Sequence, residues 1–114
     1  DTGPYWANGN NHNLTWVNNS GRMLDVYKAY VWTGVDKDGI MDVHLEAHRT
    51  SDASWLAISQ WDHYANPTLP QQGIQYDYPQ PLRIDAGDGL SIMHFAQSFG
   101  GLWHAHHWLV LWVK

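Results

Sequence analysis

Apolar and polar residues alternate along several short segments of the chain, and this period of two predicts β-strands. The clearest segment runs from Ile40 to His48. A shift of its pairing by one residue would bury charged groups and imidazoles, so its register is well specified. Its apolar face holds Met41, Val43, Leu45 and Ala47, and its polar face holds Asp42, His44, Glu46 and His48.

Turn signals separate the segments at near-regular spacing. The stretch Asp36–Gly39 predicts a hairpin turn, because an Asp-Gly pair tolerates positive φ. About eight short strands with such spacing predict an all-β fold, namely an eight-stranded antiparallel β-sandwich of jelly-roll type. The expected strands are Asn13–Val17, Leu24–Thr33, Ile40–His48, Trp55–Gln60, Gly73–Tyr78, Pro81–Asp85, Leu90–Gln97 and His107–Val113.

The sequence predicts one domain with a short N-terminal extension. Residues 1–12 are rich in Gly and Asn and are expected to form an irregular N-terminal arm. Residues 13–114 form a single jelly-roll β-sandwich domain, since no repeat or linker interrupts them.

The last expected strand, His107–Val113, is apolar on both of its faces. A strand of this kind is covered on both faces. In a two-layer sandwich the second cover has to come from a loop, from the N-terminal arm or from another subunit.

Composition narrows the class of protein. With 114 residues the chain can bury a stable core without disulfide or metal cross-links. The absence of Cys excludes disulfides, thiolate zinc sites and thiol catalysis. The net charge of −5 argues against nucleic acid and anionic membranes as partners. No apolar run reaches the ~20 residues of a membrane span.

The chain begins at Asp1 rather than Met, which predicts a mature chain whose leader has been removed. The expected location is therefore secreted, extracellular or periplasmic. Asn13 and Asn18 each begin a sequon that would accept a glycan in a eukaryotic host.

The chain has eight histidines, and several of them cluster on expected strands. Imidazole with carboxylate suits copper or zinc, so a metal site is one hypothesis. Residues i and i+4 of a straight strand lie ~13 Å apart, so His44 and His48 cannot both bind one ion without a bulge. The alternative is that these imidazoles face water. The candidate metal ligands are His44, Glu46, His48, His94, His104 and His106.

Aromatic residues make up 14% of the chain and include eight Trp, more than one small core needs. The surplus is expected at an interface or at a groove that grips sugar rings. The candidate ligand or interface residues are Trp61, Tyr64, Tyr76, Trp103, Trp108 and Trp112.

From His44 onward the chain resembles the C-terminal copper-binding jelly roll of the ascorbate-dependent monooxygenases, such as peptidylglycine monooxygenase. The likeness lies in the order of its motifs over roughly residues 43–113. The resemblance implies a jelly roll and a copper site. The sequence departs from the family, because its strand histidines stand four residues apart and the methionine ligand of the last strand is missing. The motifs are Val43–His48, Gln60-Trp61-Asp62, Asn66-Pro67, Leu69-Pro70-Gln71, Pro81–Ile84, Gly87–Leu90 and Trp108–Val113.

No Gly-x-Ser-x-Gly, phosphate-loop or His-Glu-x-x-His motif occurs in the chain. The sequence therefore predicts an exported, non-enzymatic domain that acts by binding. The leading hypothesis is a structural subunit that docks through a Trp-rich face into a homo-oligomer or a larger exported assembly. Two alternatives stay open, a carbohydrate-binding module and a copper- or zinc-binding domain related to the copper monooxygenases, which would be the enzymatic case.

Overall fold

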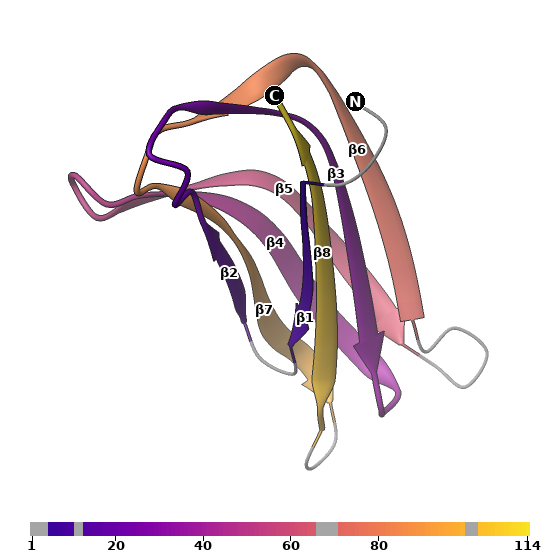
Figure 1. Cartoon of the computed structure of the whole chain (residues 1–114). Coiled ribbons are helices and arrows are strands. Elements are labelled where there is room, and N and C mark those ends of the chain that lie inside the picture. The colour runs from indigo at the N-terminus through magenta and orange to yellow at the C-terminus, as the bar shows by residue number, and fades with distance from the viewer. Residues whose placement is uncertain (1–4, 11–12, 66–70, 100–102) are drawn as a thin grey trace.

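The chain folds into β-strands arranged in two layers (Figure 1). The structure is a computed structural model that describes residues 5–10, 13–65, 71–99 and 103–114. The strands are β1 (Trp6–Asn10), β2 (Leu14–Val17), β3 (Leu24–Val35), β4 (Gly39–Arg49), β5 (Ser54–Ala65), β6 (Gln71–Ile84), β7 (Gly89–Phe99) and β8 (Ala105–Val113).

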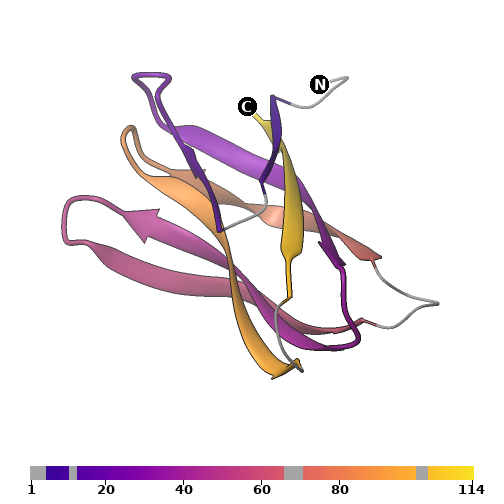
Figure 2. The same ribbon diagram turned by 90° about the horizontal axis from the view of Figure 1, so that it is seen from below.

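Two four-stranded antiparallel sheets form the layers, with strand orders β1-β8-β3-β6 and β2-β7-β4-β5. The view from below in Figure 2 shows them one over the other. Consecutive strands mostly switch from one sheet to the other, which is the connectivity of a jelly roll. The prediction of an all-β, eight-stranded sandwich is confirmed.

The alternation predicted for β4 is confirmed. Met41, Val43 and Leu45 are fully buried between the sheets, whereas Asp42 and His44 point outward. The same period on the other strands builds one apolar core. Its fully buried members include Leu24, Val26, Ala29, Val31, Leu90, Ile92, Leu109 and Leu111.

One strand replaces the two that were expected over Gly73–Tyr78 and Pro81–Asp85. The pairing of β6 with β3 shifts register between Val26 and Lys28, so a bulge absorbs the extra residues near the prolines. Proline has no backbone N–H to donate to a neighbouring strand, and edge strands tolerate it. Because β6 is an edge strand, Pro79 and Pro81 can lie in it.

The expected irregular arm over residues 1–12 is corrected at residues 6–10, because Trp6–Asn10 forms β1, whereas residues 1–4 and 11–12 lie outside the described residues. It pairs antiparallel with β8, with Trp6 opposite Leu111 and Asn10 opposite His107. Its Gly- and Asn-rich sequence has low strand propensity, and pairing with a long neighbour overrides that propensity. Residues 6–10 therefore lie beside β8, as a further strand of the sheet.

Turns form where Gly and Asn permit them. Gly21 (φ 79°) and Gly87 (φ 90°) adopt the left-handed conformation that glycine favours. The side chain of Asn18 donates to the carbonyls of Arg22 and Ile84, at 2.8 and 2.9 Å.

Among the described residues there is no helix both long and apolar enough to span a bilayer.

Candidate functional site

The outward side of the β1-β8-β3-β6 sheet carries large apolar side chains on its two central strands. Cross-strand pairing places Trp32 opposite Trp108 and Tyr30 opposite Val110. Their chain neighbours Val31 and Leu109 are buried in the core, so these four side chains point away from it. Trp108 is 41% exposed. We call this surface the aromatic face; it comprises Tyr30, Trp32, Trp108, Val110 and Trp112.

Glycines beneath the rings keep the aromatic face flat. A Cβ atom on Gly9 would collide with the Trp108 ring, and a Cβ on Gly73 would collide with the Tyr30 hydroxyl. On Gly34 it would lie 2.8 Å from a ring carbon of Trp32. Each ring therefore lies over backbone that has no side chain, an arrangement in which aromatics cover strand glycines.

Few charges interrupt the aromatic face. Lys28 lies at one end with its Nζ 5.1 Å from the centroid of the Trp112 ring, within the range of a cation–π contact. At the other end the indole nitrogen of Trp32 donates to Gln71 Oε1 at 3.1 Å, and the ring of His106 meets Trp32 edge-on at 5.7 Å. The arrangement is an apolar centre with a polar rim, which is typical of protein interfaces.

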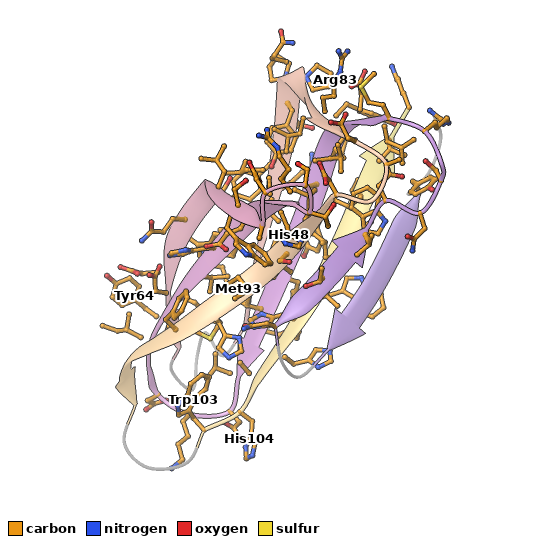
Figure 3. All side chains as sticks on the ribbon, turned by 90° about the vertical axis from the view of Figure 1, so that its left-hand side faces the viewer. His48, Tyr64, Arg83, Met93, Trp103 and His104 are labelled. Carbon is orange, nitrogen blue, oxygen red and sulfur yellow. The ribbon has the colours of Figure 1, made fainter. Side chains whose placement is uncertain are left out.

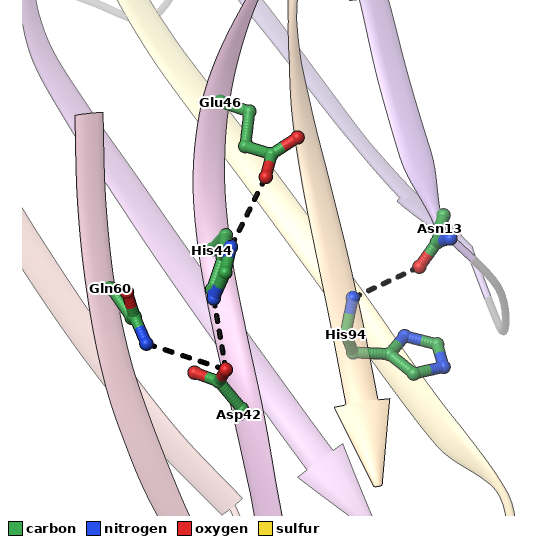
Figure 4. A network of polar contacts seen from close by, with 6 residues as sticks. All are labelled: Asn13, Asp42, His44, Glu46, Gln60 and His94. Atoms are coloured by element: carbon green, nitrogen blue, oxygen red, sulfur yellow. Dashed lines mark hydrogen bonds and ion pairs between the residues drawn. The ribbon is translucent and has the colours of Figure 1, made fainter. Parts of the chain in front are cut away.

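The outward side of the other sheet combines polar groups with exposed apolar side chains, among them Trp55, Tyr64 (labelled in Figure 3) and Phe95. There His44 bridges two carboxylates of its own strand, with Nε2 2.9 Å from Asp42 and Nδ1 3.1 Å from Glu46, and Gln60 also reaches Asp42 (Figure 4). Burial lowers the pKa of His44, but the hydrogen bonds to Glu46 and Asp42 outweigh it and raise the pKa. These groups place carboxylates on a central strand of this sheet, whereas the central strands β3 and β8 of the other sheet carry the aromatic face.

A layer of imidazoles lies between the sheets. Nδ1 of His94 on β7 lies 2.5 Å from Nε2 of His107 on β8, and Oγ1 of Thr33 on β3 lies 2.9 Å from Nδ1 of His63 on β5. Thr33, His63 and His107 are fully buried. Both contacts connect one sheet to the other. We call these four residues the imidazole layer.

The six candidate metal ligands occupy four separate places. His44 and Glu46 lie together on the outward side of the β2-β7-β4-β5 sheet with His48, whose ring stacks on Trp55. His94 points inward to His107, His104 binds Asp36 at the surface, and His106 is on the rim of the aromatic face. Within the described ranges no three His, Cys, Asp or Glu side chains are placed to hold a metal ion. We therefore assign no metal ligands.

The six candidate interface aromatics also separate. Trp61 and Tyr76 pack against the core with their ring centroids 6.2 Å apart, and burial raises the pKa of the Tyr76 phenol. Trp103 packs against the core beside His94 and lies with His104 at one end of the sandwich, and Tyr64 is exposed on the outward side of the β2-β7-β4-β5 sheet (Figure 3).

Only Trp108 and Trp112 of the six belong to the aromatic face. The sequence interpretation did not include Tyr30, Trp32 and Val110 among the candidate residues, although they lie on the aromatic face. A signal was present, because β3 is apolar on both faces around Tyr30 and Trp32, as β8 is.

No protein-family model and no curated protein matches the sequence. The solved structure of Eiger TNF from S. frugiperda is similar to this chain, with a TM-score of 0.50 and 13% identity. The match covers 96% of this chain and 93% of that chain. At this identity the likeness shows a shared jelly-roll fold and no more. It supports the jelly-roll part of the expected resemblance and gives no support to a copper monooxygenase domain.

Proposed function

We propose that this chain is an exported, non-enzymatic domain that acts by binding, and that it assembles with copies of itself through the aromatic face. The observation that carries the proposal is the position of this face. Trp32, Trp108 and Trp112 lie on the central strands of a sheet, with apolar core beneath them. Contiguous exposed apolar surface of this kind marks an interaction site on soluble proteins.

Charge distribution favours a second copy as the occupant. The chain carries a net charge of −5, and identical chains repel when their acidic surfaces meet. Asp25 and Asp77, on the sheet of the aromatic face, stand opposite the cations Arg83 and Lys28, whereas Asp42, Glu46 and Asp62 lie on strands of the opposite sheet. Contact through the aromatic faces keeps these carboxylates apart. Closed symmetric assemblies are the usual form of soluble homo-oligomers.

The decisive experiment compares two tryptophans. Trp108→Glu places a charge on the aromatic face, and Trp55→Glu makes the same change at a tryptophan of similar exposure (47%) on β5 of the other sheet. We expect the wild type and Trp55→Glu to have the mass of an oligomer by size-exclusion chromatography with light scattering. Trp108→Glu is expected to have the mass of a monomer, because a buried unpaired charge opposes association.

Val110→Glu provides a second variant with the same expected result, in case loss of the Trp108 ring loosens β1 over Gly9. Circular dichroism checks that each variant keeps its β-spectrum. A wild type that remains monomeric at every accessible concentration contradicts the proposal, as do variants of the aromatic face that keep the oligomer mass.

A further inference from the structure

We propose that the imidazole layer is an acid-sensitive clasp between the two sheets, which holds the sandwich closed near neutral pH and loosens it in mild acid. Where the chain assembles through the aromatic face, loosening the clasp releases the copies from one another. This second step rests on the proposed function, whereas the clasp itself does not.

The layer stands where a β-sandwich normally places aliphatic side chains. Its four members come from four strands, two in each sheet, and their two contacts run across the interior. On the sheet that carries the aromatic face, Thr33 and His107 are direct cross-strand partners. The polar contacts therefore connect the sheets at one shared level.

Proton counting shows why the layer tolerates only a limited charge. The facing nitrogens of His94 and His107 share one proton, which either ring can donate. When the pair takes up a further proton, both outer nitrogens carry one, and Nδ1 of the fully buried His107 ring then has no hydrogen-bond partner among the described residues. A charged imidazole there would lack both water and an acceptor.

The pKa of His107 is shifted by burial and by other imidazoles. Burial first, and then the charges of His94, His106 and His63, lower the pKa of His107 to about 3. The inward neighbours on β4, Met41 and Val43, are apolar, and Asn13 contributes a side-chain oxygen that accepts from the backbone nitrogen of His94 (Figure 4). Among the described residues, no carboxylate is one of the groups that shift His107.

The direction of the pH effect follows from this lowered pKa. The unfolded chain takes up a proton on His107 near its ordinary pKa of 6.5, whereas the folded chain does not until about 3. The unfolded state therefore binds more protons between these values, and stability falls as the pH decreases through this window. For each pH unit below 6.5 the folding equilibrium constant falls by up to about tenfold per such imidazole.

The clasp lies directly behind the aromatic face. His107 precedes Trp108 on β8, and Thr33 follows Trp32 on β3, so the same strand pair presents the clasp inward and the indoles outward. Separation of the sheets at this level removes the support beneath Trp32 and Trp108. Acid should therefore weaken assembly even though the aromatic face itself contains no carboxylate.

The test measures the urea unfolding constant and the light-scattering mass of the full chain at pH values of about 7.5 and about 5. From the higher to the lower pH, the unfolding constant of the wild type is expected to rise about 10- to 30-fold more than that of His107→Gln, which lacks the buried titrating group. His44→Gln should make the unfolding constant depend more steeply on pH than in the wild type. The raised pKa of His44 gives stability in acid that is lost as pH rises, and this variant lacks it.

An NMR titration of the wild type covers the case in which His107→Gln does not fold. The His107 ring signal is expected to show no titration while the fold persists. Equal slopes for wild type and His107→Gln, or a His107 ring that titrates near pH 6.5 in the folded chain, would overturn the clasp. A chain that is monomeric at both pH values contradicts the proposed function instead, and the unfolding slopes still decide on the clasp.

Discussion

Replacing Leu45 by alanine is expected to lower the free energy of unfolding by about 2–5 kcal/mol. Leu45 on β4 is fully buried between the sheets, opposite Ile92 of β7. Truncation removes three carbons from a close-packed interior and leaves a cavity that the two sheets cannot close without moving as layers. Urea denaturation monitored by circular dichroism measures the change.

The same substitution at Leu56 is the matched control. Leu56 is a neighbour of β4 on β5, but its side chain is 70% exposed. Its replacement by alanine should change the free energy of unfolding by no more than about 0.5 kcal/mol. Similar losses at Leu45 and Leu56 would contradict the assignment of β4 faces, and with it the two-layer fold.

Gly89→Ala is the second change with a large expected effect, a loss of about 1–3 kcal/mol or more. Gly89 begins β7 and pairs with Val17 of β2. An added Cβ would collide with the backbone carbonyl oxygen of Trp16, and a backbone atom cannot rotate away as a side chain can. The β2–β7 pairing would have to separate at this point.

Gly21→Ala separates this collision from backbone strain. Gly21 has a positive φ of 79° but nothing within 4 Å of its Cβ position. Only conformational strain opposes the substitution, so the expected loss is about 1 kcal/mol. The two losses are compared by thermal and urea unfolding. A Gly89→Ala variant as stable as the wild type would show that β2 does not lie against Gly89 as described.

Local patterns predict most of the fold. The alternation at Met41, Val43 and Leu45 is a property of a single strand that depends on burial of one face, so it is visible without knowledge of the partner strands. β1 is not visible in this way. Its residues have weak strand propensity, and only the hydrogen-bonding edge of β8 gives them a regular conformation.

The candidate site was harder to predict, because it depends on which strands become neighbours. The two-sided apolar character of β8 indicated that Trp108 and Trp112 lie on a second face outside the core, and the structure places them there. Trp32 joins them only because β3 pairs with β8, which the sequence does not state. Likewise, His94 and His107 meet across the interior from different sheets, and no spacing along the chain encodes that contact.

The histidine hypothesis illustrates the same limit. His44 and His106 looked alike in the sequence, as exposed imidazoles near strand residues. The jelly-roll connectivity puts them on the outward sides of opposite sheets, His44 between two carboxylates and His106 beside Trp32. The imidazoles that do converge, His63, His94 and His107, are the inward ones.

The most direct test of the account measures the solvent exposure of the aromatic face in the unaltered chain. Oxidative footprinting with mass spectrometry reports the reactivity of each indole in dilute and concentrated solution, with Trp55 as the internal reference. We predict that Trp108 and Trp112 become protected as concentration rises while Trp55 stays reactive. Equal reactivity of Trp108 at both concentrations would contradict assembly through the aromatic face.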